Sequence, residues 1–305
     1  MEKQAHDHKE GPSKSLTLSF WLNLCFSILE AVGGVWTNST AIITDAFHDF
    51  MDALSIGMAI QAEKLSAKKR TSTFSYGLKR FSLLSALIMS LMLLVGAVFM
   101  GIKAIGTFSS PKDVDSVGML VLALIGLGVN GFAFFKIKHG NTHHGHSHGE
   151  TNLNTRSIML HLLEDVLGWA AVLIGAGVMY LTGWNWIDGL LALCIALFIG
   201  FNASRNLVGT LKIMLQALPD NMDVNQIYTD IKQVEGVRDI HDLHIWSLDG
   251  NYHVASLHVV VGDSLDMAGQ VAIRSQVEDR LRKAGIAHPT IQIESQSESC
   301  RFISC

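Results

Sequence analysis

The stretch TDAFHDFMDALSIGMAI (44–60) combines the apolar character of a membrane span with ionisable side chains. His48 and Asp52 are four residues apart, so a helix places both on one face, with about 6 Å between their Cβ atoms. An ionisable residue at the centre of a membrane helix costs about 2.5–3.5 kcal/mol on insertion. A single histidine inside a membrane span binds a metal ion only about as often as it serves as a structural polar group or in a metal-free proton relay.

A second stretch, SIMLHLLEDVLGWAAVL (157–173), repeats the same spacing with His161 and Asp165. Two matched pairs on separate spans disfavour the structural and proton-relay alternatives, because the insertion cost is met twice. Two imidazoles and two carboxylates form an N₂O₂ set that suits tetrahedral Zn²⁺. Cu⁺ would favour sulfur ligands, and Ca²⁺ or Mg²⁺ would need more oxygens. The two pairs therefore predict one buried zinc site for transport.

The composition of the chain is that of a membrane protein. Of its 305 residues, 49% are hydrophobic and 16% are charged, and the mean hydropathy is +0.31. A soluble domain carries about 25% charged residues. Apolar stretches of about 20 residues, the length that crosses a bilayer, recur six times. We expect membrane-spanning helices near 15–36, 41–62, 79–105, 115–136, 156–181 and 187–209.

The distribution of lysine and arginine predicts how these spans are oriented. Basic residues cluster before the first span, between the second and third, and between the fourth and fifth, whereas the alternate loops hold few. Because short cytoplasmic loops carry the positive excess, both termini should be cytoplasmic. Short termini and compact loops favour a bacterial inner membrane, whereas the cysteine pair Cys300 and Cys305 in the tail favours a eukaryotic organelle. We expect a tail at 1–14, a transmembrane domain at 15–212 and a cytoplasmic domain at 213–305.

After the polar linker ALPDNMD (217–223), the remaining 82 residues have the composition of a soluble domain. Helical spacing is followed by two alternating strands around a hairpin turn, an amphipathic helix ending at a glycine, and a final strand. This α-β-β-α-β order predicts a small open-faced α/β sandwich. The expected elements are a helix at 224–234, strands at 237–248 and 252–261, a helix at 266–285 and a strand at 290–295.

This soluble segment holds candidates for a second metal site. Histidines fall on or beside each expected strand, an acid lies near the end of the last one, and two cysteines follow in the tail. The candidate ligands are His241, His258, His288, Glu294, Cys300 and Cys305. His244 and His253 are rival ligands, although strand alternation places His244 on the face opposite His241. Histidine and cysteine together favour a metal site over scattered surface histidines.

The segment HGNTHHGHSHG (139–149), between the fourth and fifth spans, interleaves five histidines with glycine and small polar residues. Its imidazoles are suited to loose binding of borderline metals. An expression tag is the mundane alternative, but tags lie at termini. We interpret the segment as a cytoplasmic metal-gathering loop with a modest contribution to transport. Its weak candidate ligands are His143, His144, His146 and His148.

The chain resembles the cation diffusion facilitator family of zinc transporters. The features that carry the resemblance are the six spans, the histidine-rich loop and the stretches TDAFHDFMD (44–52), HLLED (161–165) and VRDIHDLHIWSLDGNYHVASLHVVV (237–261). The resemblance covers nearly the whole chain. It implies a homodimer whose cytoplasmic domains have a metallochaperone-like α/β fold, and Zn²⁺/H⁺ exchange by alternating access. It also implies that zinc serves as transported substrate and as a structural or regulatory ion.

The resemblance assigns residues as well. His48, Asp52, His161 and Asp165 match the family's transport ligands, and a histidine at position 48 resembles the zinc-preferring branch. The cytoplasmic positions that match zinc-binding positions of relatives are His241, His258, His288 and Glu294. Cys300 and Cys305 resemble a tail cysteine pair of the vertebrate branch, with a different spacing. The loop SAKKRTSTFSYGLKR (66–80) lacks histidine and acid, so a further site found there in some bacterial members is predicted absent.

Two other classes of function compete with an antiporter. One is a passive divalent-metal channel, and the other is a membrane zinc receptor that acts through its cytoplasmic domain. An enzyme is disfavoured because the sequence shows no nucleophile–base set and no phosphate-binding loop. Nucleic acid is disfavoured as a partner because the formal net charge is −4 and the basic residues are scattered.

Overall fold

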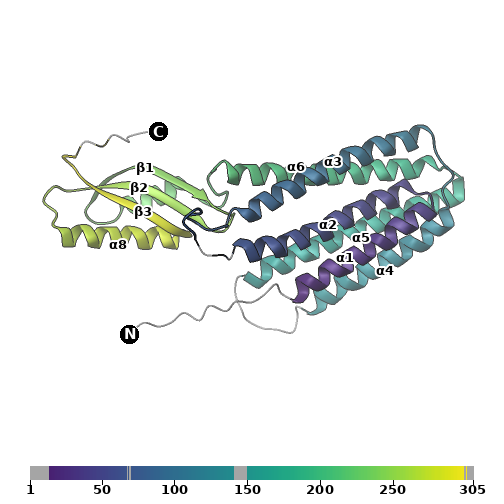
Figure 1. The fold of residues 1–305 in the computed structure, drawn as a ribbon, viewed down its shortest axis with the longest axis horizontal. Helices are drawn as coiled ribbons and strands as arrows, with labels where there is room; N and C mark the ends of the chain where they lie inside the picture. Colours follow the sequence, from purple (N-terminus) through teal and green to yellow (C-terminus); the bar gives the residue numbers. More distant parts are fainter. Residues whose placement is uncertain (1–13, 67, 69, 141–149, 299, 301–305) are drawn as a thin grey trace. The chain divides into compact units, whose positions relative to one another are not determined.

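The computed structural model describes residues 14–66, 68, 70–140, 150–298 and 300, and it leaves the side chains of 14–16, 136–140 and 150–161 undescribed. Long helices precede a small sheet along the chain (Figure 1). The chain divides into two compact units. The first unit combines Met1–Gln61 with Ile88–Arg205, and the second combines Ala62–Leu87 with Asn206–Cys305.

Six long helices form where the six spans were expected, and each extends beyond the expected range at one or both ends. They are α1 (Lys14–Trp36), α2 (Thr40–Ser66), α3 (Phe81–Ser109), α4 (Ser116–Gly140), α5 (Glu150–Thr182) and α6 (Trp186–Met214). Five of them are long and apolar enough to cross a membrane, and α2 is not among these five. Asp45, Asp49 and Asp52 lower the mean hydropathy of α2, although its 27 residues give it sufficient length.

Glycines let these helices approach one another closely in the first unit. A Cβ at Gly126 of α4 would overlap the indole ring of Trp169 on α5, so only glycine fits beneath that ring. Similarly, a Cβ at Gly189 of α6 would lie 2.7 Å from the backbone nitrogen of Phe108 on α3. Small residues at such contacts are typical of helix packing in membranes, where close backbone approach replaces hydrophobic burial.

The beginning of α2 is fixed by a side chain from α6. Asp188 is fully buried, and its carboxylate accepts hydrogen bonds from Ser39 Oγ at 2.6 Å and from the Thr40 backbone at 2.7 Å. The Ala41 backbone donates a third bond, at 3.2 Å. These N–H groups have no partner inside the helix, and the helix dipole favours a negative charge beside them. Asp188 therefore caps α2 and ties it to α6.

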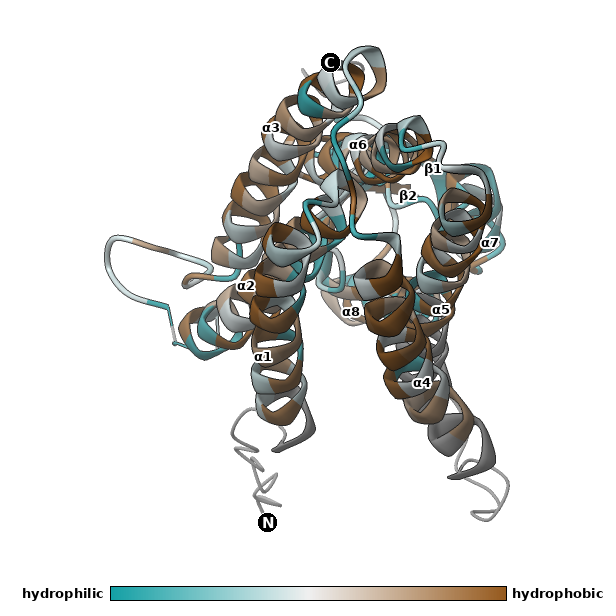
Figure 2. Ribbon diagram, turned by 90° about the vertical axis from the view of Figure 1, so that its right-hand side faces the viewer, coloured by the Kyte–Doolittle hydropathy of each residue, from teal (hydrophilic) through white to brown (hydrophobic). Residues whose placement is uncertain are grey.

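The long helices are built largely of hydrophobic residues, drawn brown in Figure 2, and many of their large apolar side chains are exposed. Trp36 is 83% exposed and Phe132 is 70% exposed. Exposed patches of this extent are rare on soluble monomers and suit contact with lipid. The membrane assignment from composition is confirmed by the five apolar helices.

The sheet of the second unit has three strands in the order β1-β2-β3. Strands β1 and β2 are antiparallel, and β2 and β3 are parallel. Apolar side chains of the sheet and the two helices form its core, around Leu257, Val277 and Leu281. The elements are α7 (Val224–Lys232), β1 (Val237–Ser247), β2 (His253–Val261), α8 (Met267–Lys283) and β3 (Ile286–Ser295).

The expected α-β-β-α-β order is confirmed, with one difference in extent. The turn forms as expected, because Asp249 Oδ1 accepts bonds from the Asn251 and Tyr252 backbones and Gly250 adopts φ +96°. Strand β3 begins at Ile286, four residues before the expected start at residue 290. Pro289 lies inside this strand. Proline is tolerated there because β3 is at the edge of the sheet, where a backbone N–H can be absent without loss of a hydrogen bond between strands.

Candidate metal centres

The histidine and aspartate of α2 lie on one helical face, as their spacing predicts. His48 Nε2 is 3.7 Å from Asp52 Oδ2, and the two side chains are 19% and 20% exposed. This distance is too long for a hydrogen bond but fits two ligands of a common ion, whose donor atoms in a tetrahedral site lie about 3.3–3.8 Å apart.

On α5, Asp165 faces the acids of α2. It interacts electrostatically with Asp45 and Asp49, which lie one turn apart on α2. His161 occupies the turn of α5 before Asp165, but its side chain is outside the described part of the chain. The structure therefore brings the α5 carboxylate toward the α2 residues, while the closure of the four-residue site remains a prediction.

Three further acids, Glu30 of α1 and Asp45 and Asp49 of α2, lie in the same region. Glu30 of α1 is 1% exposed, and by hydrogen-bond geometry its oxygens have no partner among the described residues. It interacts electrostatically with Asp45, Asp49 and Asp165. The described ion pairs join neither Glu30, Asp45 nor Asp49 to a lysine or arginine, so this region is rich in carboxylates and suited to a cation.

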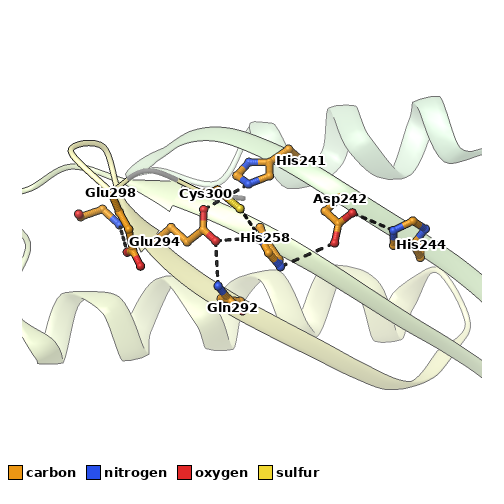
Figure 3. A network of polar contacts seen from close by, with 9 residues as sticks. His241, Asp242, His244, His258, Gln292, Glu294, Glu298 and Cys300 are labelled. Atoms are coloured by element: carbon orange, nitrogen blue, oxygen red, sulfur yellow. Dashed lines mark hydrogen bonds and ion pairs between the residues drawn. The ribbon is translucent and has the colours of Figure 1, made fainter. Parts of the chain in front are cut away.

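A second cluster lies on the sheet of the soluble unit and is drawn in Figure 3. His241 of β1, His258 of β2, Glu294 of β3 and Cys300 each offer a donor atom, and all four atoms lie within 4.8 Å of one another. His241 Nε2 is 3.2 Å from Glu294 Oε2, and His258 Nδ1 is 2.8 Å from Glu294 Oε1. Cys300 Sγ is 3.4 Å from His258 Nδ1. Three strands and the tail thus converge on one point.

The donor set fits zinc. Imidazole nitrogen, carboxylate oxygen and thiolate sulfur are its preferred ligands, and four of them complete a tetrahedral structural site. His241 Nε2 is buried and makes no properly directed hydrogen bond among the described residues. Buried polar atoms are normally hydrogen-bonded, so this nitrogen is available to bind an ion. Glu294 is 2% exposed and receives a hydrogen bond from Gln292 Nε2 at 2.8 Å, so its carboxylate is held in place.

The structure does not bring His288 into this cluster. On the parallel β2–β3 pair, His258 lies opposite Gln292, whereas His288 lies opposite Val254. Four residues along a strand correspond to about 13 Å, which is too far for a shared ion. The His288 ring instead packs edge-on against Tyr76, with ring centroids 6.0 Å apart. The early start of β3 explains this placement, because it makes His288 part of an extended strand.

The remaining candidates divide into two groups. His244 is 45% exposed and bonded to Asp242, and His253 is buried at the far end of β2; neither joins the cluster. The other group lies outside the described residues: Cys305 and the loop histidines His143, His144, His146 and His148.

Both parts of the chain match known protein families. Residues 16–215 match the cation efflux transmembrane domain, and residues 219–296 match the cytoplasmic domain of cation efflux proteins. Among solved structures, the metal-bound C-terminal domain of the CzcD transporter from Cupriavidus metallidurans is similar. It has 30% sequence identity and a TM-score of 0.22, and the match covers 24% of this chain and 99% of that domain.

Curated relatives match over nearly the full length. A cadmium, cobalt and zinc/H⁺–K⁺ antiporter from Bacillus subtilis is 34% identical over 299 residues, covering 96% of this chain and 93% of the relative. The metal cation efflux protein CzcD from Cupriavidus metallidurans is 30% identical over 292 residues, 95% of this chain and 89% of the relative. The zinc transporter ZitB from Yersinia pseudotuberculosis is 30% identical over 290 residues, covering 94% of this chain and 89% of the relative. The chain therefore belongs to the cation diffusion facilitator family, whose members are metal-cation efflux transporters.

Proposed function

We propose that the chain is a secondary active transporter that exports Zn²⁺ from the cytoplasm in exchange for protons by alternating access. The observation that carries this proposal is the group of carboxylates and His48 on α2, faced by Asp165 of α5. Carboxylates gathered within membrane helices favour a cation as cargo. Relatives named as zinc transporters and as a zinc/H⁺–K⁺ antiporter support the same conclusion.

Proton coupling follows from the chemistry of the proposed ligands, His48, Asp52, His161 and Asp165. A metal ion binds neutral imidazole and ionised carboxylate, so protons and Zn²⁺ compete for the same atoms. When the site faces the cytoplasm, Zn²⁺ displaces protons from it. When it faces the opposite side, incoming protons loosen the ligands and release the ion. A joint change in tilt of α2 and α5 would expose the one site to each side in turn.

The test is zinc-driven proton flux in proteoliposomes made with the full-length protein. Asp52→Ala and Asp165→Ala should each abolish the flux. Glu164→Ala is the matched control, because Glu164 neighbours Asp165 on α5 but is exposed. Undiminished flux in both aspartate variants refutes the site. Zinc flux that ignores the pH gradient identifies a passive channel, and protein that moves no zinc identifies a receptor.

The cargo is proposed as zinc because the four ligands form an N₂O₂ set. The names of relatives include cadmium and cobalt, so these ions are the relevant competitors. Both termini are proposed to be cytoplasmic on the basis of the lysine and arginine distribution, and the short termini and compact loops favour an inner membrane. Cysteine-accessibility labelling of a terminal residue in sealed vesicles tests this orientation, which labelling from the opposite side would overturn.

The cluster of His241, His258, Glu294 and Cys300 is proposed to hold a resident Zn²⁺ ion, and the chain to form a homodimer through this cytoplasmic domain. The matched family of residues 219–296 supports the location of such a domain. Light scattering of the detergent-solubilised protein, with and without chelator, separates the roles of this ion. Loss of the dimer on chelation indicates a structural ion, and an unchanged dimer with a changed conformation indicates a regulatory one.

A further inference from the structure

Asp242 stands beside the cytoplasmic cluster in an unusual backbone conformation. Its φ is +52°, in the left-handed region, and the β1–β2 register shifts between His241 and His244 at this point. Aspartate is one of the few residues that adopts this conformation, and a residue held there is often placed for a reason other than packing. The bulge turns the Asp242 side chain back toward β2 rather than letting strand alternation continue (Figure 3).

The carboxylate of Asp242 lies on the outer side of the His258 ring. His258 Nδ1 points to Glu294 and Cys300, at 2.8 and 3.4 Å, and its other nitrogen, Nε2, is 3.8 Å from Asp242 Oδ2. The second oxygen of Asp242, Oδ1, is 2.9 Å from His244 Nε2. His258 therefore stands between the candidate metal ligands on one side and a carboxylate on the other.

This arrangement matches a recurring requirement of metal-binding histidine. A ligating ring nitrogen presents its lone pair to the ion, so the ring proton must reside on the other nitrogen. A carboxylate that accepts this N–H fixes the ring orientation and makes the ligand more basic. With Nδ1 directed into the cluster, the proton of His258 belongs on Nε2, and Asp242 Oδ2 is the acceptor facing it. A closure of less than 1 Å converts the present 3.8 Å into a hydrogen bond.

We propose that Asp242 is a positioning residue for the cytoplasmic metal site, which holds the ring of His258 with Nδ1 directed at the ion and is itself steadied by His244. The inference rests on the proposed metal site at His241, His258, Glu294 and Cys300. It assigns Asp242 no bond to the ion. The alternative is that Asp242 only stabilises the bulge through its bond to His244, with no effect on metal binding.

The experiment uses Co²⁺ as a spectroscopic probe in the full-length, detergent-solubilised protein. Cys25 and Cys194, on α1 and α6, are replaced by serine, so thiolate-to-cobalt absorption arises from the tail alone. Asp242→Asn and Asp242→Gly are compared with this background, because asparagine and glycine both tolerate positive φ and preserve the bulge. Asp239→Asn is the matched control on the same strand, since Asp239 pairs with Lys232 and not with the cluster.

We expect Asp242→Gly to raise the half-saturating Co²⁺ concentration about 10–100-fold and to shift the ligand-field bands. Asp242→Asn should have a smaller effect, because its amide oxygen still accepts a hydrogen bond, and Asp239→Asn none. Unchanged titrations and spectra in both Asp242 variants overturn the inference, as does a loss of metal-free thermal stability without a change in Co²⁺ binding. Failure of the underlying site is distinguishable, because the parent protein would then show no thiolate-to-cobalt absorption.

Discussion

His258 Nδ1 lies 2.8 Å from Oε1 of Glu294, so an imidazole nitrogen and a buried carboxylate are close enough to bind the same ion. Cys300 reaches the same nitrogen from the tail, at 3.4 Å. We predict that Cys300→Ser abolishes thiolate-to-cobalt absorption and weakens Co²⁺ binding, because a hydroxyl is a poor replacement for a thiolate ligand. A Co²⁺ titration of the full-length protein measures both effects. Cys194→Ser, on α6, should leave the absorption intact, and its loss there would place the thiol ligand elsewhere.

The cap that Asp188 provides to α2 should contribute strongly to stability. Asp188→Ala removes three hydrogen bonds from a fully buried site and leaves the Ser39 hydroxyl and two backbone N–H groups unsatisfied. A lost cap and unsatisfied buried donors predict a decrease of about 2–3 kcal/mol in the free energy of unfolding. Unfolding in mixed detergent, titrated with sodium dodecyl sulfate, measures the change. The exposed Asp113 is the control, and an equal effect of Asp113→Ala would contradict the assignment.

His253 should make the soluble unit sensitive to acid. Burial of the imidazole lowers its pKa below the usual 6.5, opposed by the negative charge of Asp249, and its Nδ1 has no hydrogen-bond partner among the described residues. Since the folded pKa is lower than the unfolded value, stability is greatest above pH 6.5. It declines as the pH falls from there toward the folded pKa, where the decline ends.

Replacement of His253 tests this sensitivity. Between pH 7.5 and pH 5.5, the melting temperature of the chelator-treated protein should decrease less in His253→Phe than in the wild type. His288→Gln is the control, because His288 is an exposed histidine of the same sheet. Parallel pH profiles for the wild type and His253→Phe would assign the acid sensitivity to other groups.

Replacement of His48 should change the choice of ion. In His48→Asp the proposed set becomes one imidazole and three carboxylates, which accommodates a larger ion more readily because each carboxylate offers two oxygens. We expect the ratio of cadmium to zinc flux to rise about tenfold, which corresponds to 1.4 kcal/mol of differential binding. Uptake of zinc, cadmium and manganese into proton-loaded vesicles measures this ratio. An unchanged ratio would remove His48 from the determinants of selectivity.

Helical periodicity explains how much of the membrane site was predictable. The i, i+4 spacing of His48 and Asp52 determines their common face whatever surrounds the helix. The same argument could not reveal Glu30, because its position beside Asp45 and Asp49 depends on how α1 packs against α2. Nor could it reveal Asp188, whose partner Ser39 lies 149 residues earlier in the chain.

In the second unit, strand alternation likewise predicts only features that lie within a single strand. It predicted the histidines of β1 and β2 as sheet residues, and His241 and His258 are indeed opposite one another. It was wrong about the face of His244, because the register shift after His241 places His244 opposite Ser256, on the same face as His241. It could not place His288 relative to this pair, since which residues of two parallel strands lie side by side depends on the crossover helix α8 and not on the strand itself. The bulge at Asp242 was also invisible, because aspartate is equally at home in turns, caps and exposed strand positions.

The cap on α2 has a mechanical consequence for transport. A rigid helix that is held at one end can only pivot about that end, and the hydrogen bond to Asp188 places the pivot of α2 at Thr40. His48 lies about 12 Å along the axis from that point and Ser66 about 39 Å. A rotation of about 10° would therefore displace His48 by only about 2 Å but the far end of α2 by about 7 Å. In the proposed transport cycle, His48 would keep a nearly constant position while the distant end of α2 moves, so a small rearrangement at the proposed ion site would accompany a larger displacement at one end of the span.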